Sequence, residues 1–218
     1  MKKLLLVASV VLMGVAVQAQ ETRFGVKAGY SLTMLKVDGD QDDLEERTTD
    51  PSHTFYVGGL VEHKFSDTFG IQGELLYSPL GGKEDYNVSE GQLYFREKSK
   101  VTFGTLLIPV SAKYFITENL SVALGASFGV ILSAKQKTVI DAGIGIPGLE
   151  LEGDDEVDIK DDVNTLNIAP FLGAEFMLEN GLFFDARYNY GISDLSKSEG
   201  KITNSFLQVG VGFKFGGN

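Results

Sequence analysis

The sequence has no cysteine, no tryptophan and only two histidines among its 218 residues. Structural disulfides, cysteine nucleophiles and the common Cys/His zinc sites are therefore excluded. Basic residues are also scarce, because 19 Lys and Arg stand against 30 Asp and Glu and give a formal net charge of −11. A surface this acidic repels phosphate backbones, so we expect no nucleic acid partner.

Proline is rare as well, with 5 residues, whereas the chain contains 26 Gly, 15 Phe and 8 Tyr. Many glycines and aromatics with charge gathered in patches favour short strands joined by polar loops over a helical bundle.

The N-terminal segment is typical of a secretory signal peptide. Lys2 and Lys3 precede an apolar stretch from Leu4 to Val17, and Val17-Gln18-Ala19 places small residues at the cleavage positions. The stretch is shorter than the roughly 20 residues that a membrane-spanning helix needs. We expect residues 1–19 to be a signal peptide and residues 20–218 to form one exported domain.

Alternation of apolar and polar residues with period two dominates the rest of the chain and indicates β-strands. It predicts eight strands, near residues 23–32, 53–65, 69–79, 100–115, 121–133, 164–178, 182–192 and 207–215. Short turns and long loops alternate between them, with the long loops near 33–52, 80–99, 134–163 and 193–200. All long loops then lie at one end, as in outer-membrane barrels, which have short periplasmic turns and long external loops.

The composition of the two strand faces decides which face points outward. A soluble barrel such as a lipocalin is the alternative, but its solvated face would carry many long polar residues. Here the second face is rich in Gly, Ser and Ala, which suits the narrow interior of an eight-stranded barrel. We therefore expect an all-β, antiparallel, up-and-down transmembrane barrel that closes on itself. Its lumen is predicted to hold paired charges, namely Lys27, Glu62, Lys64, Glu74, Lys113, Glu175, Asp185, Arg187 and Lys214.

Tyrosines on the outer face are expected at the levels of the lipid headgroups, where amphipathic rings are favoured. These are Tyr30, Tyr77, Tyr114, Tyr188 and Tyr190.

Three stretches resemble a known family. The segment TFGTLLIPVSAKYFITENLSVALGASFGVIL at 102–132 is similar to a central hairpin of the outer membrane protein beta-barrel domain, a porin-like family of Gram-negative bacteria. The segments ENGLFFDARYNYGISDL at 179–195 and FLQVGVGFKF at 206–215 resemble its last two strands. The resemblance implies an OmpA/OmpX-like barrel in the outer membrane. It also implies that Phe213 and Phe215 form a C-terminal signal for the barrel-assembly machinery, although three residues follow Phe215. The position after Leu106, often acidic in the family, is Leu107 here, so one inward pairing is absent.

Two motifs resemble ligand sites without the required context. Residues 143–148 match the dinucleotide pattern G-x-G-x-x-G, but Pro147 stands where a helix would begin and five acidic residues follow. Asp38, Asp40 and Asp42 have the spacing of calcium ligands, but Asp43 and Thr49 replace the required Gly and Glu of an EF-hand. No cofactor or metal site is expected from either motif.

The two histidines bear on an enzymatic alternative, since some small outer-membrane barrels modify lipids or cleave peptides at the external rim. His53 follows Asp50 and Ser52, but neighbouring residues in one loop do not supply a converging nucleophile, base and orienting group. His63 is expected near the short turns, facing lipid. We therefore expect no catalytic residues.

Acidic residues gather in two of the long loops. Residues 33–52 contain seven acidic and two basic residues, and residues 134–162 contain nine and three. Solvated loops are one interpretation, and weak binding of divalent ions that bridge to lipopolysaccharide is the other.

Eight strands leave space for side chains and little else, whereas water-filled porins use about sixteen to eighteen strands. We expect a monomer with a closed, charge-paired lumen and a structural or surface-interaction role. The partners expected are outer-membrane lipid and lipopolysaccharide. The alternative function is a narrow channel for small solutes.

Overall fold

The computed structural model describes residues 22–38, 47–90, 93–143, 150–198 and 200–217. The predicted signal peptide at 1–19 lies outside these residues. Within the described part, no helix has the length and hydrophobicity needed to cross a bilayer.

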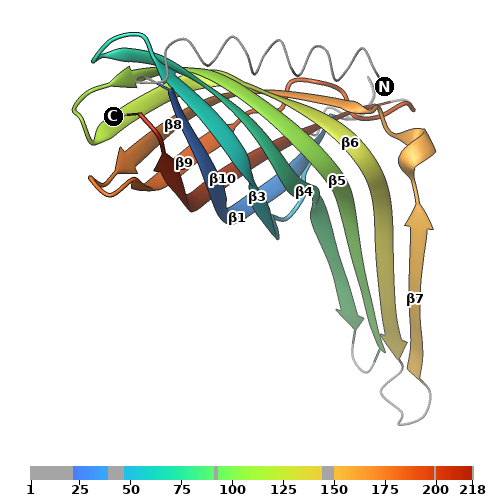
Figure 1. The fold of residues 1–218 in the computed structure, drawn as a ribbon. Helices are drawn as coiled ribbons and strands as arrows, with labels where there is room; N and C mark the ends of the chain where they lie inside the picture. The colour runs from blue at the N-terminus through green and yellow to red at the C-terminus, as the bar shows by residue number, and fades with distance from the viewer. Residues whose placement is uncertain (1–21, 39–46, 91–92, 144–149, 199, 218) are drawn as a thin grey trace.

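The described chain is almost entirely β-strand (Figure 1). The strands are β1 (Thr22–Asp38), β2 (Arg47–Thr48), β3 (Ser52–Lys64), β4 (Phe69–Glu90), β5 (Leu93–Phe115), β6 (Leu120–Gly143), β7 (Glu150–Asp158), β8 (Leu166–Met177), β9 (Leu182–Asn189) and β10 (Lys201–Phe215). Between β7 and β8 the described chain forms a 3₁₀ turn, η2 (Lys160–Asp162).

Eight of these strands close into a ring. The order β1, β3, β4, β5, β6, β8, β9, β10 is antiparallel throughout, and β10 returns to pair with β1 from Phe24↔Phe215 to Asp38↔Lys201. The barrel satisfies its own backbone hydrogen bonds, which lipid cannot do. The predicted eight-stranded up-and-down barrel is confirmed.

Three short turns gather at one end of the barrel, as expected. Ser66 Oγ accepts the backbone N–H of Phe69, and Thr117 Oγ1 accepts that of Leu120. In the third turn Gly181 has φ +88°, a left-handed conformation that glycine adopts without a Cβ clash. Local side-chain bonds of this kind favour tight hairpin turns.

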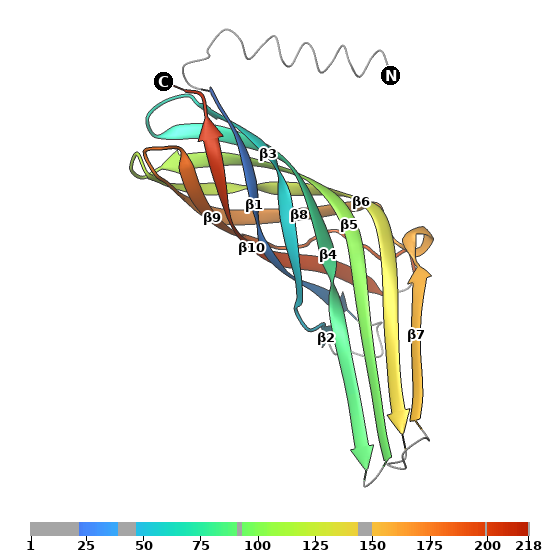
Figure 2. The ribbon, with the colours of Figure 1, turned by 60° about the horizontal axis from the view of Figure 1, so that its bottom comes forward.

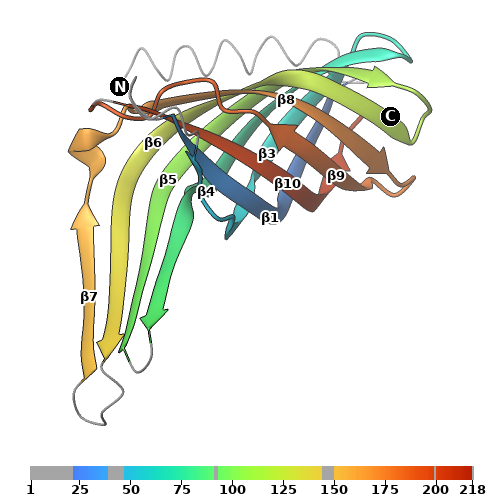
Figure 3. The same cartoon turned by 180° about the vertical axis from the view of Figure 1, so that it is seen from behind.

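The residues predicted as long loops at 80–99 and 134–163 are mostly strand, so this part of the prediction is wrong. β4, β5 and β6 continue past the barrel, and β7 pairs with β6 from Lys135↔Asp158 to Gly143↔Glu150. The result is a four-stranded sheet, which we call the arm and which comprises residues 82–90, 93–102, 134–143 and 150–158. Figures 1 and 2 show the arm bending away from the barrel wall, and Figure 3 shows it from behind.

A bulge marks the place where β6 leaves the barrel. The register with β5 shifts between Gly104 and Thr105, so Leu132 has no opposite partner. The extra residue changes which positions face inward: Ile131 is buried before the bulge, and Ala134 is buried after it. The inward face of the lumen therefore continues onto the arm.

The outer surface of the barrel is apolar. On β10, for example, Leu207, Val209 and Val211 are exposed, whereas Gln208 and Lys214 are buried. All five predicted girdle tyrosines, Tyr30, Tyr77, Tyr114, Tyr188 and Tyr190, are exposed on this surface. Aromatic pairs lie towards both ends, with Phe69–Tyr114 ring centroids 5.2 Å apart and Phe55–Tyr77 centroids 6.3 Å apart.

Candidate functional site

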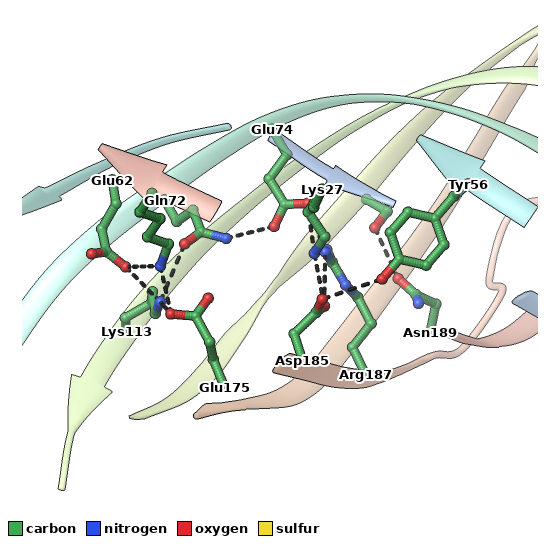
Figure 4. Close-up of polar contacts among 12 residues, drawn as sticks. Lys27, Tyr56, Glu62, Gln72, Glu74, Lys113, Glu175, Asp185, Arg187 and Asn189 are labelled. Atoms are coloured by element: carbon green, nitrogen blue, oxygen red, sulfur yellow. Dashed lines mark hydrogen bonds and ion pairs between the residues drawn. The ribbon is translucent and has the colours of Figure 1, made fainter. Parts of the chain in front are cut away.

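The lumen is the part of the barrel where the chemistry-bearing side chains converge. Alternate residues of every barrel strand point into it, and it contains two layers with different chemistry. The layer nearer the short turns holds eight charged residues (Figure 4), and the layer nearer the arm is mostly apolar, with a few buried polar side chains such as Thr33 and Asn204.

A first cluster of charges joins Lys113 and Lys214 to Glu62 and Glu175. Lys113 Nζ donates to Glu62 Oε2 at 2.5 Å and to Glu175 Oε1 at 2.8 Å. Lys214 Nζ donates to the same two oxygens, at 2.7 Å and 2.5 Å. Each ammonium thus bridges both carboxylates, and the cluster is electrically neutral. Since burial of an unpaired charge is very costly, mutual neutralisation is what makes this layer tolerable.

A second neutral cluster lies deeper in the lumen. Lys27 Nζ is 2.7 Å from Asp185 Oδ2 and 3.4 Å from Glu74 Oε2. Arg187 Nη2 reaches the same two atoms, at 3.5 Å and 2.6 Å. Two cations again face two carboxylates, and they come from strands on different sides of the barrel (Figure 4). The network therefore spans the lumen.

Two neutral residues complete the network and were not identified from the sequence. Gln72 links the clusters, because its Oε1 accepts from Lys113 Nζ at 3.2 Å and its Nε2 donates to Glu74 Oε1 at 2.7 Å. The Tyr56 hydroxyl donates to Asp185 Oδ1 at 3.2 Å. Both residues occupy inward positions on their strands, so the alternation of inward and outward residues could have identified them as lumen residues.

Of the nine residues expected in the lumen, all except Lys64 make ion pairs with one another. Lys64 is half-buried at the end of β3, and its Nζ lies 4.0 Å from the centroid of the Phe115 ring. Among the described residues it has no carboxylate partner. Its strand ends at the rim, where the side chain has less contact with the network, so the expectation of a paired Lys64 is wrong.

The second layer is an apolar plug, which the expectation of small residues and paired charges did not include. Leu76, Leu80, Leu107 and Phe206 are each at most 1% exposed. Val163 and Leu195, from the connections before β8 and β10, belong to the same buried cluster. Leu107 therefore replaces an inward charge with apolar packing, and the connections cover the plug from the external side.

Little empty space remains between the charged residues. A cavity of about 20 Å³ lies among Glu74, Lys113, Glu175 and Arg187. This volume accommodates about one water molecule. The described lumen contains ion pairs and a mainly apolar plug in succession.

The other sequence motifs lie apart from this network. His53 is exposed on the outer surface, where its Nδ1 contacts the Tyr30 hydroxyl. His63 Nδ1 contacts Thr22 Oγ1 at 2.8 Å near the short turns. Asp38 pairs with Lys36, whereas Asp40, Asp42 and residues 144–148 lie outside the described residues. In the described ranges, no group of three or more His, Asp or Glu side chains is placed to hold a metal ion.

The C-terminal strand ends in outward-facing aromatics. Phe213 and Phe215 are exposed, and the Phe215 ring stacks on Phe24 of β1 with centroids 6.5 Å apart. Both residues thus lie beside the seam where the last strand closes the barrel. Their recognition by the assembly machinery stays a prediction.

Several solved structures are similar to this chain. Among solved structures, the chain is similar to Ail, the attachment invasion locus protein of Yersinia pestis, crystallised with the heparin analogue sucrose octasulfate, with 15% identity over 89% of this chain and 99% of that one and a TM-score of 0.46. It is also similar to OprG from Pseudomonas aeruginosa, with 13% identity over 91% and 99% of the two chains and a TM-score of 0.42. Neisserial surface protein A is similar as well, with 15% identity over 88% of this chain and 97% of that one and a TM-score of 0.41. No curated protein sequence matches.

The sequence pattern of the outer membrane protein beta-barrel domain matches residues 18–197, which is most of the chain. With the closed ring, the apolar outer surface and the inward charges already described, the chain belongs to the outer membrane protein beta-barrel domain family and is an eight-stranded barrel of the Gram-negative outer membrane.

Proposed function

We propose that this protein is a non-enzymatic outer-membrane barrel whose closed lumen anchors the external arm, with a structural or surface-interaction role. The observation that carries the proposal is the double closure of the lumen by the ion-pair clusters and the apolar plug. An ion passing through would have to displace paired charges and then cross a layer of buried apolar side chains. Both steps oppose permeation.

The arm supports the surface role. Its four strands extend outside the ring, so their side chains are available to other molecules, whereas the barrel residues face lipid or the closed lumen. On the face continuous with the lumen, Tyr86, Phe95, Ile140 and Leu151 are exposed. The arm replaces the long acidic loops as the main candidate element for contacts at the cell surface.

The absence of catalysis is part of the proposal. It is supported by the positions of the histidines, because His53 faces outward beside Tyr30 and His63 lies beside Thr22. Neither imidazole is within hydrogen-bond distance of a described carboxylate. A nucleophile, a base and an orienting group do not converge at either histidine.

Conductance across a planar lipid bilayer tests the closed lumen. Purified, monomeric protein is expected to give no stable single-channel steps, whereas a sixteen-stranded porin in the same bilayer gives them. A Phe206→Ala variant serves as the comparison, because it removes a ring that is fully buried in the plug. Reproducible steps from the unmodified protein would favour the narrow-channel function instead, and a change in ion selectivity on substitution of Lys113 would assign them to the lumen.

A further inference from the structure

Three lysines lie side by side across the base of the arm. The register pairs Lys83 of β4 with Lys100 of β5, and Lys100 with Lys137 of β6. We call these three residues the lysine row. Like charges that are directly opposite on neighbouring strands repel each other. An alignment of three lysines therefore favours an anion above the row.

The described carboxylates neutralise only the flanks of the row. Lys83 Nζ is 3.5 Å from Asp85, and Lys137 Nζ is 3.7 Å from Asp154 of the edge strand β7. Lys100, at the centre, has no carboxylate within 4 Å among the described residues. Lys98, which precedes Lys100 by two positions in β5, likewise has no carboxylate within 4 Å among the described residues. The side chains of Lys98 and Lys100 are both exposed.

Strand parity places the lysine row on the face that continues the lipid-facing surface of the barrel. On β5, Val110, Ile108 and Leu106 face outward, and the same parity leads to Lys100 and Lys98. On β4 the outward series runs from Leu75 and Tyr77 to Lys83. The same face thus changes from apolar to cationic on adjacent strands.

The change occurs beyond the last exposed apolar residues of the barrel wall. On β6, the exposed apolar Leu132 precedes Lys137 of the row by five residues, or about 17 Å of extended strand. The arm also bends away from the barrel (Figures 1 and 2), so the height above the hydrocarbon is smaller than the distance along the strand. The polar headgroup region extends roughly 5–8 Å beyond the hydrocarbon on each side, and the bend of the arm brings the row towards it.

We propose that the lysine row and Lys98 bind the phosphate groups of anionic lipid in the outer leaflet. Lysine ammonium groups on flexible stems suit phosphates, whose positions vary from lipid to lipid. The acidic residues of the edge strand β7 repel phosphate on that side of the row. The lipid therefore approaches over β4 and β5. The proposal is independent of whether the lumen conducts ions, because lipid retention and conductance are separate measurements.

Native mass spectrometry of the purified full chain tests the proposal. The probes are diphosphorylated lipid A and the same lipid with its phosphates removed. We expect the protein to retain the phosphorylated lipid at least about tenfold better, since each lysine near an anionic surface contributes roughly fivefold in affinity. The triple variant Lys83→Gln, Lys100→Gln, Lys137→Gln is expected to lose this preference.

A matched control removes the same charge elsewhere at the external end, with Lys160→Gln, Lys197→Gln and Lys201→Gln. This control is expected to retain phosphorylated lipid as the unmodified protein does. Gel mobility before and after boiling reports whether each variant has a folded barrel. Equal retention of both lipids by the unmodified protein, an unchanged preference in the folded lysine-row variant, or an equal loss in the control would overturn the proposal. Displacement of the lipid by inorganic phosphate at equal phosphate concentration would overturn its assignment to a lipid.

Discussion

Replacement of Lys113 by methionine is expected to destabilise the barrel strongly. Lys113 Nζ contacts Glu62 at 2.5 Å, Glu175 at 2.8 Å and Gln72 at 3.2 Å, and its side chain is 1% exposed. Its loss changes the first cluster from neutral to a net charge of −1. Removal of one partner from a buried ion pair costs about 3–5 kcal/mol. We expect the lower end of that range, because Lys214 continues to contact both carboxylates.

A second substitution separates charge balance from packing. In the double variant Lys113→Met, Glu62→Gln, the remaining Lys214 and Glu175 form a neutral pair at 2.5 Å. We expect a coupling energy of about 1–3 kcal/mol in favour of the double variant, as is typical for contacting residues in one network. Lys135→Met is the control, because this exposed arm lysine lies outside the lumen, and no measurable loss of barrel stability is expected.

The assay is equilibrium unfolding in urea of protein in lipid vesicles. Far-UV circular dichroism and the gel shift on boiling are the signals, because the chain has no tryptophan for fluorescence. A loss below about 1 kcal/mol in Lys113→Met, or a double variant as unstable as the sum of its single changes, would refute the idea that the cluster is stabilised as a neutral unit.

Three further perturbations test other parts of the molecule. In the arm, the hydrogen bond and charge of Lys135 lower the pKa of Glu156. This contact is therefore present above the ordinary carboxyl range and is lost as the pH falls through the lowered pKa. Carboxyl NMR titration in micelles is expected to show a higher pKa for Glu156 in the Lys135→Gln variant. Gly210→Ala is expected to destabilise the barrel by roughly 1–3 kcal/mol, because a Cβ there lies 2.7 Å from the Ala28 carbonyl oxygen and 2.0 Å from the Tyr56 hydroxyl, and normal unfolding would contradict this. Phe206→Ala is expected to cost about 3–5 kcal/mol in the same urea assay through the cavity it leaves in the plug.

The barrel itself could be predicted because one face of each strand meets lipid and the other meets a crowded lumen. This difference imposes the alternation seen, for example, in Val209 and Val211 against Gln208. Parity alone then placed Glu62, Lys113 and the other buried charges on the inner face. The exact partners were beyond reach, since they depend on the relative register of strands far apart in the sequence.

The arm could not be predicted in the same way. Both of its faces are open to solvent, so no burial imposes alternation, and the segment from Lys83 to Glu90 has the charge and polarity of a loop. The apolar plug was missed for a related reason. Leu76 has inward parity, but the lumen was expected to hold small residues and paired charges, and Leu80 falls in a segment that was predicted as a loop. The bulge at Leu132, which exchanges the faces of β6, has no distinct signal in the sequence.

The continuity of the strands between barrel and arm has a mechanical consequence. β4, β5 and β6 contain 22, 23 and 24 residues, and each continues from the barrel wall into the arm as one uninterrupted strand. The arm is therefore a rigid extension of the barrel wall and is not joined to it by a flexible linker. A load on the far ends of these strands is transmitted as torque to the barrel, and rotation of the barrel about the membrane normal carries the arm around with it. A partner of the arm must therefore approach at a height and direction set by the barrel, because three paired strands bend far less readily than a single-chain linker.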